Sequence, residues 1–137
     1  MTLSPEVLES LHRFCAIYMT GVIWFVQLVQ YPMLHRTNGE NHAEGHQEYT
    51  RRMGLAVGPV MLAELGLQIA WVTQIPDARS VAGAILLFVI WASTFFLQVP
   101  CHRDLEENYD PDTHRELVRS NWIRTFAWTA RAILLSM

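Results

Sequence analysis

Three long stretches with few or no charged residues limit what this chain can fold into. Residues 14–34 and residues 80–101 contain no charged side chain, and residues 54–75 contain only Glu64. A helix needs about 20 predominantly apolar residues to cross the hydrocarbon core of a bilayer. Each of the three stretches therefore predicts a membrane-spanning helix.

A fourth helix is expected near the C-terminus. Residues 121–135 carry Arg124 and Arg131 and would not qualify as a span alone, but their many apolar residues fit a helix packed in a bundle. We expect one domain over residues 1–137, all-α, forming an integral membrane four-helix bundle. A soluble four-helix bundle is the alternative, because buried helices are also apolar on every side. The expected helices lie at 5–34, 44–73, 79–99 and 113–135.

The sequence also predicts where helices begin and where two helices pack closely. Ser4 before Pro5 is expected to cap the first helix, and Asp112 or Thr113 the fourth. Gly54 and Gly58 have the four-residue spacing that lets two membrane helices approach closely.

Polar residues of the first half recur in the second half at an offset of 68 residues. The apolar residues mostly differ, so the recurrence is not simply shared hydrophobicity. It predicts two duplicated helical hairpins, at about 5–73 and 79–135, with a polar site between them at one end of the bundle. The matched pairs are Gln30 and Gln98, Pro32 and Pro100, His46 and His114, Glu48 and Glu116, and Arg51 and Arg119.

The charged residues indicate how the bundle is oriented. The chain has no Lys and a net charge of −3, which argues against a nucleic-acid partner. Six of its arginines belong to the two long loops or the helix starts that follow them, against Arg13 and Arg79 at the other end. The positive-inside bias then predicts cytoplasmic long loops and both termini outside, in a bacterial inner (plasma) membrane. Cys15 and Cys101 form no metal-ligand or disulfide pattern and are expected to be apolar fillers.

Charged side chains inside the apolar stretches are expected to face the bundle interior. A charge facing lipid is costly, so Glu64, Arg124 and Arg131 should point inward. Glu64 and Arg131 should lie at similar depth and form an ion pair. Two interpretations of Glu64 stay open at this stage: half of a structural pair, or a proton carrier and substrate contact.

Four histidines gather near the long-loop end of the expected bundle: His35, His46, His102 and His114. Imidazole is a common metal ligand and the usual acid or base at neutral pH. Three interpretations of the four histidines stay open. They form a site for iron, copper, zinc or haem, they form an acid–base site without a cofactor, or they are polar groups at the membrane surface. In His-x-Glu the two side chains point about 200° apart on a helix, which weakens a symmetric metal site.

The third and fourth segments resemble the small four-helix membrane proteins related to anthrone oxygenases. The resemblance rests on the Gln-Val-Pro-Cys-His-Arg-Asp-Leu stretch at 98–105 and on 117–125, where Pro100, Leu105, Asn121 and Arg124 match in kind. His102 stands near a position where that family often has Asn. The resemblance implies a four-helix membrane protein and, in some relatives, oxygenation of an aromatic polyketide.

These observations predict a small oxidoreductase or oxygenase in the lipid bilayer that acts on a lipophilic or aromatic molecule. A homo-oligomer is open for a chain of this size. Two other functions stay open: a haem- or metal-binding electron-transfer protein, and a non-catalytic transporter or scaffold subunit. The expected catalytic residues are His46, His102, His114, Glu64 and Arg124. The expected substrate contacts are Gln30, Gln98, Asn121, Trp24, Trp91, Trp128 and Arg131.

Overall fold

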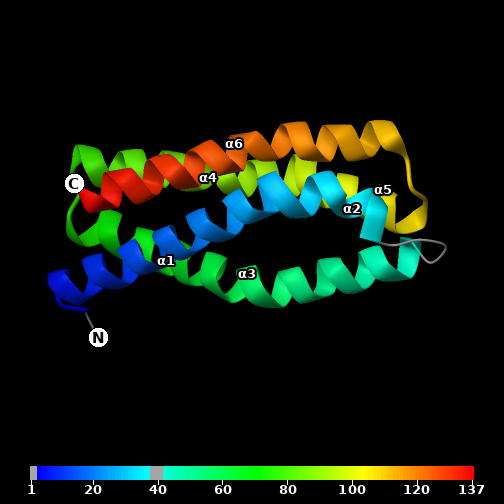
Figure 1. Ribbon diagram of the computed structural model, residues 1–137. Coiled ribbons are helices and arrows are strands. Elements are labelled where there is room, and N and C mark those ends of the chain that lie inside the picture. Colours follow the sequence, from blue (N-terminus) through cyan, green and yellow to red (C-terminus); the bar gives the residue numbers. More distant parts are fainter. Residues whose placement is uncertain (1–2, 38–41) are drawn as a thin grey trace.

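The computed structural model describes residues 3–37 and 42–137, and the regular structure in these two ranges is entirely helical. Its helices assemble into an elongated bundle with both chain ends at the same end, as predicted (Figure 1). The elements in chain order are α1 (Pro5–Phe25), η1 (Val26–Gln30), α2 (Tyr31–Thr37), α3 (His42–Gln74), α4 (Ala78–Ser93), η3 (Thr94–Gln98), α5 (Val99–Glu107) and α6 (Pro111–Ser136).

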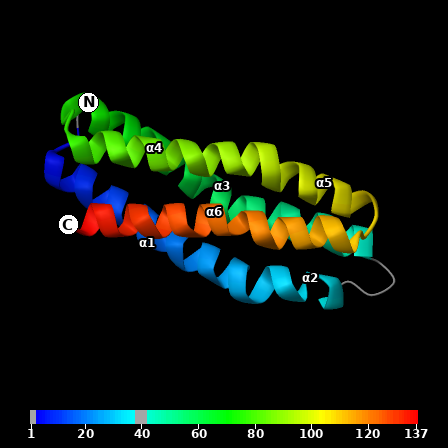
Figure 2. The same ribbon diagram turned by 90° about the horizontal axis from the view of Figure 1, so that it is seen from above.

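These elements form four rods around one axis. The segments α1, η1 and α2 make one continuous rod and α4, η3 and α5 another, with α3 and α6 as the remaining two. Helix α6 packs on α1 and α4, and α3 packs on α1, α4 and α5, so α3 and α6 face each other across the centre (Figures 1 and 2). The interior is therefore lined by all four rods.

Capping residues explain where the helices start. The Ser4 side chain accepts a hydrogen bond from the Val7 N–H and Pro5 occupies the first turn, which confirms the predicted cap. Helix α6 starts earlier than expected, because Asp110, not Asp112 or Thr113, accepts from the Thr113 N–H at 2.8 Å. Pro111 then fits the first turn, where a missing N–H costs nothing.

A single turn of π-helix interrupts each of the two composite rods. In η1 the Tyr31 N–H bonds to the Val26 carbonyl, and in η3 the Val99 N–H bonds to the Thr94 carbonyl. Each wide turn directly precedes a proline, Pro32 or Pro100, whose ring would clash with a regular helical turn before it. The third rod consequently continues past Val99, where the sequence predicted its end, through α5 to Glu107.

The bundle buries charged side chains of its apolar helices and exposes large apolar side chains on its outside. Glu64 and Arg131 are fully buried and Arg124 is 8% exposed, as predicted, whereas Phe96 is 79% exposed. Helix α6 follows the same rule, because Phe126 on its outer face is 60% exposed. Three rods are long and apolar enough to cross a membrane: residues 5–34, 42–74 and 78–107. Buried Cys15 and Cys101 are free thiols.

Close helix packing occurs at a glycine other than those predicted. A methyl group on Gly54 or Gly58 would meet no atom within 4 Å, so these residues do not pack a second helix of this chain. A methyl group on Gly83 would lie 2.9 Å from Gln68 Oε1 and 3.1 Å from Trp71 Cζ3. The close contact is therefore between α3 and α4, near the turn that joins them.

Candidate functional site

A cavity of about 170 Å³ lies in the centre of the bundle, in the half nearer the long loops. Apolar side chains from α1, η1 and α3 make most of its wall, together with Trp128 of α6. A wider depression of about 530 Å³ lies outside the bundle among exposed charged residues of α6, but its lining includes no buried polar group. The polar groups of the central cavity are Tyr31, Tyr49, Thr50, Thr94, Gln98, His102 and Arg124.

Arg124 is anchored to the cavity wall by neutral acceptors. Its Nε donates to Asn121 Oδ1 at 2.9 Å, and its Nη2 donates to Gln98 Oε1 at 3.1 Å and to the Tyr31 hydroxyl at 3.3 Å. Its Nη1 reaches only the Thr94 hydroxyl, at 3.4 Å. Asn121 is itself held by Gln27, whose Oε1 accepts from Asn121 Nδ2 at 2.9 Å.

The guanidinium of Arg124 is buried without an acidic partner in the described parts of the chain. Two other arginines of α6 do form ion pairs in these parts of the chain, Arg115 with Asp112 and Arg131 with Glu64. An uncompensated buried charge is costly. A guanidinium in this position is therefore suited to a negatively polarised oxygen of a molecule in the cavity.

Two of the predicted histidines lie in direct contact. His46 Nε2 of α3 is 3.0 Å from His102 Nδ1 of α5, and His102 Nε2 is 2.9 Å from the Tyr31 hydroxyl. His46 is fully buried. These bonds connect the long-loop end of α3 to the polar wall of the cavity.

His114 lies at the same end but outside this set of contacts. Its Nε2 bonds to the Tyr31 carbonyl oxygen at 2.6 Å and its Nδ1 to the Tyr109 hydroxyl at 3.0 Å. Both ring nitrogens therefore help to hold α6 against α2 and the preceding loop. His35 lies in α2, and its side chain is outside the described part of the chain.

A second buried polar cluster surrounds the predicted ion pair. Arg131 Nη2 lies 3.6 Å from Glu64 Oε1, and Glu64 Oε2 accepts from the Trp128 indole at 2.9 Å. Arg131 also donates to His12 Nε2 at 2.7 Å and to Gln68 Oε1 at 2.9 Å. Because Glu64 is 18 residues beyond His46 on one helix, about 27 Å separates them. Glu64 and the histidines therefore do not form one site.

Comparison with protein-family models, with curated proteins and with solved structures found no match to this chain. The resemblance to the anthrone oxygenase-like proteins stays a prediction from the sequence. Functional inference therefore rests on the geometry of the site.

The tryptophans and glutamines predicted as substrate contacts divide between the cavity and other places. Trp128 and Gln98 line the cavity. Trp24 instead donates to the Thr129 hydroxyl at 3.0 Å between α1 and α6, and Trp91 stacks on Phe95 with ring centroids 5.4 Å apart. Gln30, although it matches Gln98 in the repeat, is absent from the cavity lining that the structure describes.

Several cavity residues were not predicted as site residues. Tyr31 and Thr94 belong to inward-facing polar stripes at helical spacing, and this signal was sufficient to find them. Gln27 belongs to the same kind of stripe, but it bonds to Asn121 and does not line the cavity. Tyr49 is different, because no pattern in the sequence pointed to it. Its buried hydroxyl makes no hydrogen bond to a described residue.

The metal hypothesis receives no support from the described side chains. Among the side chains that the structure describes, which do not include that of His35, no three His, Cys, Asp or Glu side chains gather where they could hold one ion. His46 and His102 point ring nitrogens at each other. Glu48, beside His46 in the sequence, pairs instead with Arg51 and Arg52 on the outside of α3.

Proposed function

We propose that this chain is an integral membrane protein whose long loops face the cytoplasm and whose termini face the other side of a bacterial inner membrane. Its outer surface supports this, because large apolar residues are exposed on all four rods while the charged residues in mid-helix point inward. The positions of the arginines set the orientation.

We also propose that the bundle arose by duplication of a helical hairpin. The π turns η1 and η3 are 68 residues apart, the same offset at which the polar residues recur. Single π turns are rare and occur mostly at functional sites. Two of them at matching positions, one on each side of the cavity, favour a common origin for the halves.

The cavity is proposed to bind a lipophilic molecule with an oxygen-bearing aromatic head group. The observation that carries this proposal is the buried Arg124 guanidinium, which lines an otherwise largely apolar cavity and has no carboxylate partner among the described residues. A phenolate or a quinone carbonyl oxygen would accept its hydrogen bonds, and charge-assisted bonds of this kind are the strong ones.

The volume of the cavity limits the head group to about one ring. A cavity of about 150 Å³ in another protein holds benzene, and this one is similar at about 170 Å³. Its lining includes exposed Gly54 on α3 and Val99 on α5, which is 48% exposed. A hydrophobic tail attached to the ring would leave through this side into the lipid.

The reaction is proposed to be oxidation or oxygenation of that ring with dioxygen as the oxidant, which accepts the electrons and protons that the ring loses or adds an oxygen atom to it with release of water. Arg124 would stabilise the phenolate form, from which an electron is removed more easily than from the neutral phenol. Gln98 and Asn121 would hold the guanidinium in position, and Trp128 would pack against the ring. Tyr31 and His102 would exchange hydrogen bonds with the ring oxygen.

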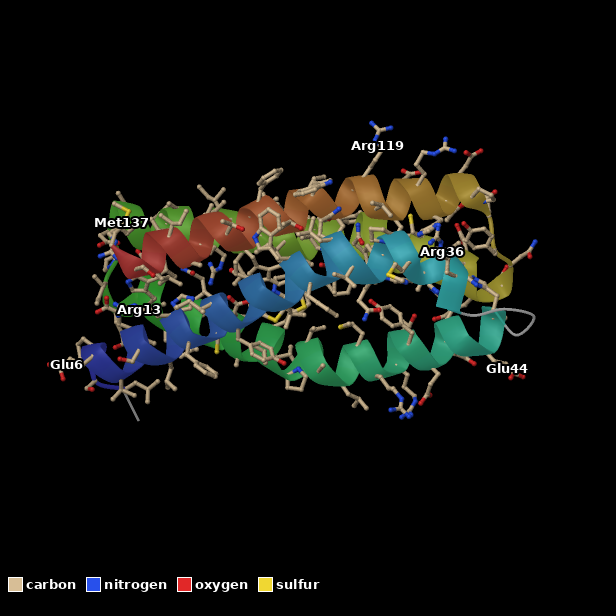
Figure 3. The ribbon with its side chains drawn as sticks, viewed as in Figure 1. Glu6, Arg13, Arg36, Glu44, Arg119 and Met137 are labelled. Carbon is tan, nitrogen blue, oxygen red and sulfur yellow. The ribbon has the colours of Figure 1, made fainter. Side chains whose placement is uncertain are left out.

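Product analysis in membranes tests this proposal. Membranes containing the wild-type chain, Arg124→Gln or Arg119→Gln would be incubated in air with their own extracted lipophilic aromatics, and the extracts compared by mass spectrometry. Arg119 is the matched control because it lies on the same helix and points away from the bundle (Figure 3). Wild type and Arg119→Gln should consume an aromatic compound that gains oxygen or loses hydrogen, and Arg124→Gln should not.

Two results would refute the enzyme. One is identical extracts from wild type and from membranes without the protein. The other is full turnover by Arg124→Gln, because it would place the chemistry outside the cavity.

A further inference from the structure

We propose that the cavity exchanges protons with the long-loop end of the bundle through a chain formed by His46, His102 and Tyr31. This inference rests on the proposed function, since it supplies or removes the proton of the ring oxygen bound beside Arg124. It goes beyond binding, because it assigns a route to the proton.

The chain is continuous over three side chains from three elements. His46 Nε2 of α3 lies 3.0 Å from His102 Nδ1 of α5, and His102 Nε2 lies 2.9 Å from the Tyr31 hydroxyl of α2. Both distances are those of ordinary hydrogen bonds. His102 therefore bonds to His46 with one ring nitrogen and to Tyr31 with the other.

The two ends of the chain lie where a proton would enter and leave. At the outer end, His46 Nδ1 makes no hydrogen bond to a described residue. Next to it, the half-buried ring of His42 stacks on His46 in the first turn of α3, with centroids 5.7 Å apart. At the inner end, the Tyr31 hydroxyl lies 3.3 Å from Arg124 Nη2, where the ring oxygen is proposed to bind.

The groups that face the chain favour transfer through neutral rings. Arg124 of α6 is positively charged and bonds to the same Tyr31 hydroxyl as His102, so a second positive charge on His102 would be disfavoured. The other titratable neighbours are His42 and Tyr49 from α3, Cys101 from α5 and His114 from α6. In the described parts of the protein, no carboxylate bonds to His46 or His102, so no acidic group there stabilises a positively charged imidazolium.

The transfer balances without any other reactant. Tyr31 gives its hydroxyl proton to the ring oxygen and receives one from His102 Nε2. His102 takes a proton on Nδ1 from His46 Nε2, and His46 takes one on Nδ1 from the long-loop side. Each protein group ends with its original number of protons, the two imidazoles have changed tautomer, and one proton has moved to the ligand.

Stopped-flow mixing with 4-nitrophenol tests this chain, because the phenolate of this single-ring probe is yellow and its phenol is nearly colourless. The protein in lipid nanodiscs would be loaded with the phenolate and mixed with acidic buffer. We expect His102→Gln and Tyr31→Phe to slow the loss of colour from bound probe at least tenfold and to change the probe's affinity much less. His46→Gln, further from the cavity, should slow the same step.

Two controls separate this effect from a structural one. His114→Gln removes a histidine at the same end whose nitrogens bond to the Tyr31 backbone carbonyl and the Tyr109 hydroxyl, and to no atom that carries the transferred proton, so it should leave the rate at the wild-type value. In His102→Ala, added imidazole should restore part of the rate, whereas a merely structural loss would not be rescued. Thermal unfolding would verify that each variant is folded.

The outcomes distinguish this inference from the function on which it rests. If the wild-type protein does not bind 4-nitrophenolate, both the proposed function and the proton-transfer chain are refuted. If binding is normal but His102→Gln and His46→Gln protonate the bound probe at the wild-type rate, only the chain is refuted, because the proton then arrives by another route.

Discussion

The carboxylate of Glu64 and the guanidinium of Arg131 lie 3.6 Å apart in the interior of the bundle, and both side chains are fully buried. Their remaining hydrogen bonds are with Trp128, Gln68, His12 and the Gly83 carbonyl, all of them protein groups. The pair thus joins α3 to α6 across the bundle without facing the central cavity. This geometry favours the structural interpretation of Glu64 over the catalytic one.

Neutralising one member of this pair should destabilise the fold. Glu64→Gln and Arg131→Met each leave one buried charge without compensation, and we expect a cost of about 3–5 kcal/mol for each. The double variant should lose less than the sum, because neither charge remains. Unfolding of the detergent-solubilised protein in denaturant measures all three. A Glu64→Gln protein of wild-type stability that no longer binds ligand would instead make Glu64 part of the site.

The close contact at Gly83 predicts a second difference in stability. Gly83→Ala would push a methyl group against Gln68 and Trp71 and should cost about 1–3 kcal/mol. Gly66→Ala on the outer face of α3 meets nothing within 4 Å and should be neutral or stabilising by up to about 1 kcal/mol. Thermal unfolding of the two variants checks this, and equal melting temperatures would refute the close packing of α3 on α4.

Metal removal should leave ligand binding unchanged. The ring nitrogens of His46 and His102 bond to each other and to Tyr31, and those of His114 to Tyr31 and Tyr109, which leaves few nitrogens for an ion. Binding of 4-nitrophenolate should therefore be the same before and after treatment with a chelator. One equivalent of bound metal, lost in His46→Gln and His102→Gln, would support the metal-centred alternative.

The cap of α6 predicts a specific response to acid. Hydrogen bonds from the Thr113 hydroxyl and N–H hold the pKa of Asp110 below its usual value of 3.8. A carboxyl group with a lowered pKa in the folded state stabilises the fold above its unfolded pKa and loses this effect as the pH falls. Asp110→Asn keeps a capping side chain without the charge. The melting temperatures of the two proteins should differ above about pH 5 and converge in stronger acid, and a constant gap would contradict this account.

The sequence predicted the inward charges but only part of the site, for physical reasons. A charged side chain in an apolar membrane helix must face the bundle interior, so the inward positions of Glu64, Arg124 and Arg131 were predicted correctly. Gln27 lies within the π turn η1, and this wide turn shifts the facing of the residues that follow relative to a regular helix. Helical periodicity alone therefore could not determine that Gln27, and not Gln30, reaches Asn121.

Contacts between distant segments were less accessible from the sequence. His102 meets His46 because the third rod continues through η3 and Pro100, whereas the sequence placed the helix end at residue 99. Trp24 and Trp91 do lie on the faces that periodicity assigned to them, but those faces pack on neighbours outside the cavity. Which neighbour covers which face depends on the assembled bundle.

Photolabelling with 4-azidophenol tests the central claim most directly, since it shows where a single-ring phenol binds. The cavity account predicts labels on Met53, Val57 or Met61 of α3, and not on Leu62, which faces outward on the same helix. Arg124→Gln should reduce this labelling about 10- to 100-fold through the loss of about 1.5–3 kcal/mol of charge-assisted hydrogen bonding, and Arg119→Gln should not. Labels spread over the outer face, at the same level in Arg124→Gln, would contradict a binding site inside the bundle.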